Sequence, residues 1–156
     1  LIDGASSLGT LCHSAQYEQN TRQCTLFAVS ISPTGTAQYN PNANVLYFEK
    51  LCVPEAVMGK CKGDMRRVPQ YILIGHARAT VDAPTHSSCV EKCMTAFVNF
   101  GFICRSAMHF YEFSKENCIL NVHSSRTRAP FFTAEKRQKV DYIEMNDCFH
   151  DERECF

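Results

Sequence analysis

Several features are missing from this sequence of 156 residues, and each absence removes a class of function. Sixteen basic residues are balanced by sixteen acidic ones, and zero net charge argues against a dedicated nucleic-acid-binding protein. No apolar stretch of about 18 residues occurs, so the sequence predicts no membrane-spanning helix. No Asn-x-Ser/Thr acceptor site occurs either, so we expect no N-linked glycan to cover a surface.

Recognised catalytic motifs are also missing. Six histidines and several serines could supply a catalytic triad by number alone, but neither Gly-x-Ser-x-Gly nor His-Glu-x-x-His occurs. We therefore expect no catalytic residues, no cofactor and no enzyme activity.

Cysteine, in contrast, is abundant, with ten in the chain. This density predicts a disulfide framework formed in an oxidising compartment, so we expect a secreted or extracellular protein. The apolar fraction of 45% and the charged fraction of 21% are those of a domain with a packed core. The sequence begins with Leu-Ile-Asp-Gly, which is neither a start methionine nor a signal peptide, so we expect a piece of a longer secreted chain.

An internal repeat organises the chain. Three blocks recur in one order with near-equal spacing: 11–15 with 103–107, 24–26 with 118–120, and 45–52 with 140–148. The repeat predicts the following divisions: the second half of a module at 1–52, a linker at 53–60, a complete module at 61–148, and a linker with the start of a possible further module at 149–156.

Two polar side chains are kept between the copies. Tyr47 matches Tyr142, and Glu49 matches Glu144. Each pair has the two-residue spacing of one strand face. We interpret this as strand packing with a solvated or paired carboxylate, and not as a catalytic pair.

A helix over residues 88–101 is the central element of the complete module. Ser88 and Glu91 have the spacing of a capping box, and Gly101 is suited to a left-handed helix end. The face of the predicted helix that should be buried comprises Cys89, Cys93, Ala96, Phe97 and Phe100.

The two helical cysteines, Cys89 and Cys93, cannot bond each other. Positions four apart on a helix have β-carbons about 5–6 Å apart, whereas a disulfide requires about 3.5–4.5 Å. They must bond two other cysteines or hold a metal together. Zinc could use Cys89, Cys93, Cys104 and His86. We favour disulfides because of the cysteine density, and because the first copy repeats its cysteines without an accompanying histidine.

Short strands surround the predicted helix. The sequence predicts them at 71–74, 80–84, 102–113, 118–122 and 140–145, with a loop or long hairpin tip over 123–133. Strands around a single helix, without strand–helix–strand alternation, indicate an antiparallel α+β module.

The order of cysteines and the surrounding motifs resemble the PAN/apple domain family. The resemblance rests on a first cysteine, the helical Cys-x3-Cys, Cys-Arg-Ser at 104–106, Cys-Ile-Leu at 118–120, and a final Tyr-x-Glu-x3-Cys at 142–148. It covers residues 61–148, and the preceding half copy matches too. It implies a curved antiparallel sheet that cradles one α-helix, and a binding function without catalysis.

The resemblance also implies a disulfide pairing. The implied bonds are Cys61–Cys148, Cys89–Cys118 and Cys93–Cys104, whereas spacing alone would allow 15 pairings. By the same alignment, we expect Cys12, Cys24 and Cys52 to have natural partners upstream of Leu1, and Cys155 to have one downstream.

A basic segment at residues 123–139 is the candidate binding site. Five cations and two aromatic side chains form this candidate: Arg126, Arg128, Phe131, Phe132, Lys136, Arg137 and Lys139. Glu135 is the one acidic residue there, so the segment could bind an anionic glycan or an acidic protein, with the aromatics as anchors. The simpler alternative is a solvated hairpin, because charged loop residues usually face water.

From these features we expect a tandem PAN/apple binding module of a secreted or surface-anchored matrix, cuticle or adhesion protein. Its expected partners are extracellular proteins or anionic glycans, together with neighbouring PAN modules of the same chain. The alternative is a docking module of a secreted serine protease or growth factor, and a zinc-binding domain is a more distant one.

Overall fold

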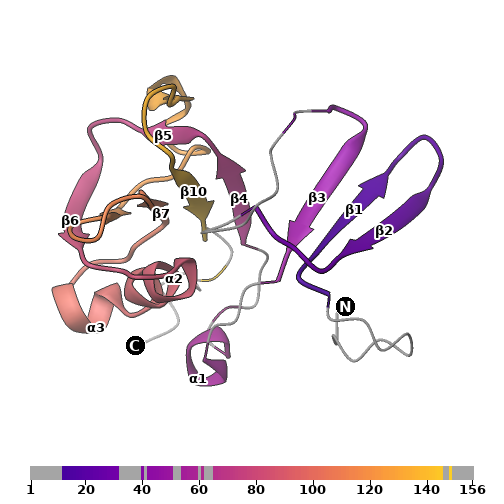
Figure 1. Cartoon of the computed structure of the whole chain (residues 1–156). Coiled ribbons are helices and arrows are strands. Elements are labelled where there is room, and N and C mark those ends of the chain that lie inside the picture. The colour runs from indigo at the N-terminus through magenta and orange to yellow at the C-terminus, as the bar shows by residue number, and fades with distance from the viewer. Residues whose placement is uncertain are drawn as a thin grey trace. The chain divides into compact units, whose positions relative to one another are not determined.

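The computed structural model describes residues 12–31, 40, 42–50, 54–59, 61, 65–145 and 148. The chain divides into two compact units, residues 1–52 and 53–156. Figure 1 shows the helices and strands of each unit.

The N-terminal unit contains a three-stranded antiparallel sheet. Its strands are β1 (Ser14–Glu18), β2 (Gln23–Phe27) and β3 (Val45–Glu49), in the order β2-β1-β3. The turn between β1 and β2 ends at Arg22, which has a φ of 57°. On one face of the sheet Ala15 is buried, but its cross-strand neighbours Leu26 and Phe48 are 42% and 47% exposed.

The C-terminal unit begins with the short helix α1 (Glu55–Met58), which lies in the predicted linker. Its main sheet has five antiparallel strands in the order β4-β10-β7-β8-β6. These strands are β4 (Arg66–Pro69), β6 (Ala77–Val81), β7 (Ser106–His109), β8 (Cys118–Asn121) and β10 (Asp141–Glu144). A separate two-stranded sheet pairs β5 (Tyr71–Leu73) with β9 (Phe132–Ala134), which follows the 3-10 helix η1 (Ala129–Phe131).

Both faces of the five-stranded sheet are covered. Helix α2 (His86–Met94) packs on one face, where its buried residues meet Ala107, Leu120 and Ile143. On the other face, Met108 and Tyr142 pack with Leu73 of β5, and Phe132 of β9 joins this cluster. Because both faces are buried, all four residues of β10 are buried. The α+β fold is confirmed.

The predicted helix over 88–101 is wrong at its start. Helix α2 begins at His86, with Thr85 as the N-cap. The Thr85 hydroxyl accepts the Ser88 N–H at 3.1 Å, and the Ser88 hydroxyl accepts the Thr85 N–H at 3.0 Å. Ser88 is therefore the third helical residue of the capping box, where Glu or Gln is more usual, and not the cap.

The predicted single helix is also interrupted. Thr95 separates α2 from α3 (Ala96–Phe100), and its hydroxyl donates to the Glu91 carbonyl at 2.8 Å. The break turns Phe97 and Phe100 away from the core, so these two rings are 62% and 44% exposed and were wrongly predicted to be buried. Gly101 does end the second helix in the left-handed conformation, with a φ of 75°.

The strand predictions differ from the structure by more than one residue at three places. The strand predicted at 80–84 lies at 77–81, because the Ala83 N–H bonds the Asn117 side chain and Pro84 has no N–H to donate. The strand predicted at 102–113 is confined to 106–109. The predicted loop at 123–133 contains the start of β9, which pairs with β5 through Leu73 and Phe132.

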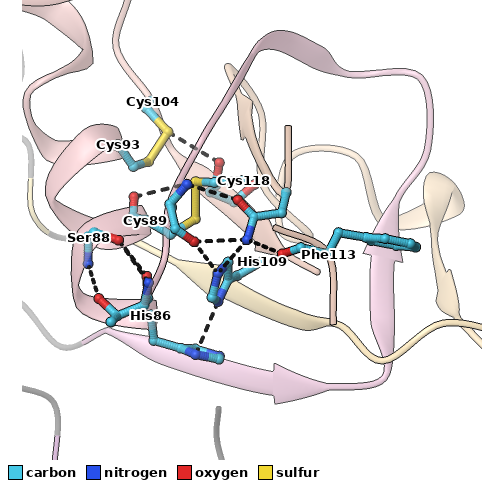
Figure 2. Close-up of a disulfide and its surroundings, with 12 residues drawn as sticks. His86, Ser88, Cys89, Cys93, Cys104, His109, Phe113 and Cys118 are labelled. Carbon is cyan, nitrogen blue, oxygen red and sulfur yellow. Dashed lines mark hydrogen bonds between the residues drawn. A yellow bond between two sulfur atoms is a disulfide. The ribbon is translucent and has the colours of Figure 1, made fainter. Parts of the chain in front are cut away.

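Three disulfides stabilise the C-terminal unit. They join Cys61 to Cys148, Cys89 to Cys118, and Cys93 to Cys104, which are the pairs that the family resemblance implies. Figure 2 shows the last two, which attach α2 to β8 and to the segment before β7. Among the described residues, Cys12 is a buried free thiol and Cys24 an exposed one. Cys52 and Cys155 lie outside the described residues.

Candidate ligand-binding surface

The β5–β9 sheet carries a stack of aromatic rings. Tyr71 and Phe132 stack with ring centroids 4.8 Å apart, and Phe132 also lies 4.7 Å from Tyr142 in the core. Tyr71 is 37% exposed and Phe131 is 47% exposed. Phe132 therefore connects an exposed aromatic surface to the core, while Phe131 is available at the surface.

A buried polar network fixes the start of the basic segment. The Ser125 N–H donates to the Tyr142 hydroxyl at 2.7 Å and to the Glu144 carboxylate at 3.1 Å, and the Ser125 hydroxyl donates to the same carboxylate. Burial raises the pKa of Tyr142 to about 12, so its hydroxyl stays neutral and able to donate to Glu144.

The N-terminal unit contains the same network. The Tyr47 hydroxyl donates to Glu49 at 2.7 Å, and the Ile31 N–H bonds both side chains. Burial raises the pKa of Tyr47 as well. The predicted role of these repeated residues, strand packing with a paired carboxylate, agrees with this arrangement.

The five predicted binding cations are not equivalent. Arg126 pairs with the buried Glu144 at 3.0 Å, and Lys139 pairs with the exposed Glu112 at 3.0 Å. For Arg128, Lys136 and Arg137, the described residues provide no ion pair, and all three are exposed. Arg126 thus neutralises a buried carboxylate, whereas Arg128, Lys136 and Arg137 present charge to solvent.

Glu135, the acidic residue of the segment, is directed toward the backbone. Its carboxylate accepts the N–H groups of Arg137 at 2.6 Å and Gln138 at 3.3 Å. These bonds lower the pKa of Glu135, which is therefore ionised and shapes the turn. The segment stays cationic because its five basic residues outnumber this one ionised carboxylate.

Two histidines that the sequence analysis did not select lie beside these residues. The His76 ring packs edge-on against His123 and Phe131, with centroids 5.0 Å away in each case. The sequence signals only a turn there, through Gly75 directly before His76, and in the structure this glycine has a φ of 78°. The proximity of His123 could not be predicted, because it depends on the folding of three separate turns.

A second polar cluster is buried under α2 and is not open to a ligand. His86 bonds the Asp141 carboxylate, which also pairs with Arg67 at 2.8 Å. The Nδ1 atoms of His109 and His86 are 3.1 Å apart, and the Nε2 atom of His109 donates to the Ala83 carbonyl at 2.9 Å (Figure 2). Burial, and then His86, lower the pKa of His109 to about 4. We assign this cluster to anchoring α2 on the sheet.

The zinc alternative receives no support from the sulfur atoms. All three cysteines of the hypothetical site are in disulfides: Cys89 is bonded to Cys118, and Cys93 is bonded to Cys104. Within the described part of the chain, no three His, Cys, Asp or Glu side chains are grouped as metal ligands. Among the helices of that part, none is long and apolar enough to cross a membrane.

Comparisons with known proteins agree with the geometry. A family model described as PAN domain matches residues 4–52 and 61–148, which confirms the predicted family. An uncharacterized protein of Caenorhabditis elegans, F52C9.5, is 33% identical over 135 residues. The aligned region covers 86% of this chain but 21% of that relative, so the chain spans about a fifth of its length. No solved structure matches significantly.

Proposed function

Because the chain belongs to the PAN domain family, whose members are generally non-catalytic binding modules, we propose that it serves in an extracellular matrix or adhesion protein and binds an anionic polysaccharide. The proposed site is the aromatic–cation surface, defined as Tyr71, Arg128, Phe131, Lys136 and Arg137. The observation that carries the proposal is that the exposed ring of Phe131 lies in the same segment as three cations outside ion pairs, while the exposed ring of Tyr71 lies on β5, which pairs with that segment.

The aromatic part of this surface is suited to sugar rings. A pyranose has an apolar face of C–H groups, which packs on a flat aromatic ring, while its hydroxyls remain in water. Tyr71 is held by its stack on Phe132, so little side-chain entropy is lost when a ligand packs on it.

The cationic part of the surface supplies charge recognition. The Arg128 guanidinium can form two parallel hydrogen bonds to a sulfate or carboxylate, whereas Lys136 and Arg137 add attraction over a distance of about 8 Å at physiological ionic strength. An acidic protein would use the same cations. We favour the polysaccharide because it also uses the exposed rings.

A binding assay with three polymers tests this choice. We expect the whole chain to bind dextran sulfate, with weaker binding as salt rises, and to bind uncharged dextran at least tenfold more weakly. Equal binding of polyglutamate would instead indicate an acidic protein partner. Binding to none of the three would contradict the proposal.

Matched triple variants locate the site. The variant R128Q/K136Q/R137Q should weaken dextran sulfate binding by at least tenfold. The control K50Q/K92Q/K115Q removes the same charge from exposed positions outside the aromatic–cation surface and should change binding by about twofold or less. Arg126 is left intact, because removing it would leave the buried Glu144 without this partner.

A further inference from the structure

Three separate turns converge at His76 and His123. The Ile74 N–H donates to the Phe131 carbonyl at 3.0 Å, which joins the turn after β5 to η1. The Arg128 N–H donates to the Ser124 carbonyl at 2.9 Å, and the Ser106 hydroxyl donates to the His123 carbonyl at 2.7 Å. The backbone around the two imidazoles is therefore fixed by hydrogen bonds from each turn.

The surroundings of the two rings favour an anion. His123 is influenced by Arg128, His76 and Arg105, all of which are cationic or can become so. The Nε2 atom of His76 is buried and has no hydrogen-bond partner among the described residues. Neither Glu144, which bonds Ser125 and Arg126, nor Glu135, which bonds the backbone, is among the charged groups that shift the pKa of His123.

We propose that His76 and His123 form, together with Arg128, an anion-binding cluster that takes up protons when a sulfate or carboxylate of the polysaccharide binds. This inference rests on the proposed function, because it extends the aromatic–cation surface at Phe131 and Arg128. It makes polysaccharide binding dependent on pH, with tighter binding at mildly acidic pH.

The physical basis is the linkage between proton and anion binding. Burial lowers the pKa of His123, and Arg128, His76 and Arg105 lower it further, so neighbouring cations oppose its protonation. A bound anion reverses that opposition and raises the pKa of an imidazole beside it. By reciprocity, a rising proton concentration must then tighten anion binding.

The charged groups of the basic segment and the buried His109 do not account for such an effect between pH 7.5 and 5.5. Arginine and lysine remain charged throughout, and the pKa of Glu135 lies below its ordinary value. His109 is buried, and its pKa of about 4 places its titration below this range. His13, which is exposed in the N-terminal unit, provides a control position.

The experiment measures the Kd of the whole chain for dextran sulfate between pH 7.5 and 5.5 at constant ionic strength. Each proton taken up changes Kd by at most tenfold per pH unit, and for partial uptake we expect about tenfold tighter binding across the range. Isothermal titration at pH 6.5, in buffers of different ionisation enthalpy, should count net proton uptake on binding.

The double variant H76Q/H123Q should lose most of the pH dependence and the proton uptake on binding, so that its Kd at pH 5.5 lies within about twofold of its own Kd at pH 7.5. The control H13Q should behave like the parent. A parent Kd that does not change with pH, or an unchanged pH dependence in H76Q/H123Q, would overturn the inference but leave the proposed function standing. Absence of dextran sulfate binding at every pH would overturn both.

Discussion

The two units present the same three central strands in two different surroundings. The strand partners are equivalent: Ser14 pairs with Phe27 and Glu49, and Ser106 pairs with Asn121 and Glu144. The serine hydroxyls also act alike, donating to the carbonyls of Val29 and His123. The three strands and the serine hydrogen bond, here called the shared frame, therefore form in each unit, whether or not a helix packs on them among the described residues.

The difference lies on the face that α2 covers in the C-terminal unit. There Leu120 and Ile143 are buried, whereas the matching Leu26 and Phe48 in the N-terminal unit are exposed. The matching cysteines differ in the same way, since Cys118 is bonded to the helix and Cys24 is an exposed thiol. The comparison shows that the helix and its disulfides convert an open sheet face into a core.

Polar residues on this face differ as well. His109 and Asp141 lie opposite each other on β7 and β10 beneath α2, and the matching pair in the N-terminal unit is Tyr17 and Leu46. The buried histidine–aspartate cluster is therefore not part of the shared frame. It belongs to the way in which α2 is held in the C-terminal unit.

The largest expected difference between the units follows from disulfide removal. Replacing both Cys61 and Cys148 by alanine opens a loop with a sequence separation of 87, which on the chain-entropy model lowers the free energy of unfolding by about 4.5 kcal/mol. Denaturant unfolding and unit-resolved hydrogen exchange should show this loss in the C-terminal unit.

The N-terminal unit is the internal reference for that experiment. Its described cysteines are free thiols, so its exchange rates should not change in the double variant. Equal loosening of both units would contradict the independence of the two frames. Unchanged stability of the C-terminal unit would show that its core is sufficient without this bond.

A smaller difference is expected from pH. Because the pKa of His109 is lowered from its ordinary value of 6.5 to about 4, the unfolded chain binds this proton first as pH falls. The stability that the C-terminal unit gains from a neutral His109 is therefore fully present above pH 6.5 and is lost toward pH 4. The loss is roughly 3 kcal/mol in the free energy of unfolding. Unfolding of the C-terminal unit at pH 7 and pH 4 measures it.

The variant H109Q tests whether this histidine is the cause. It should be less stable than the parent at pH 7 but should lose less stability on acidification. In the N-terminal unit the described histidine, His13, is exposed, so exchange there should depend little on pH once the intrinsic exchange rates are corrected. A parent-like pH dependence in H109Q would assign the effect to other groups.

The shared frame was predictable because it is encoded in local repeats. The cysteine spacing, the strand blocks and the Tyr-x-Glu pairs are visible in the sequence, and they led to the fold and the family. The helix break at Thr95 was not, because a hydroxyl that bonds the Glu91 carbonyl leaves no distinct sequence pattern.

The candidate surface was predictable only in part. The basic composition of residues 123–139 identified the segment, but composition alone does not distinguish the cations that form ion pairs from those that do not. Arg126 forms an ion pair with Glu144, which lies 18 positions away on β10, and Lys139 forms one with Glu112. Tyr71 and His76 join the surface through strand pairing and turn packing, which depend on tertiary structure.

The smallest expected difference comes from the residue pair that the units share. Tyr142→Phe removes a hydroxyl that accepts the Ser125 N–H and donates to Glu144 inside a fully buried network. Leaving buried partners unsatisfied costs about 1–3 kcal/mol, so the C-terminal unit should lose about 1–2 kcal/mol. Tyr47→Phe removes the equivalent hydroxyl at a half-buried position, where water can replace it, so the N-terminal unit should lose less than about 1 kcal/mol.

Unit-resolved hydrogen exchange of the two single variants measures both values, and the double variant should show that the effects add, because each frame holds its own network. A larger loss for Tyr47→Phe than for Tyr142→Phe would mean that the N-terminal network is less accessible to water than its exposure indicates.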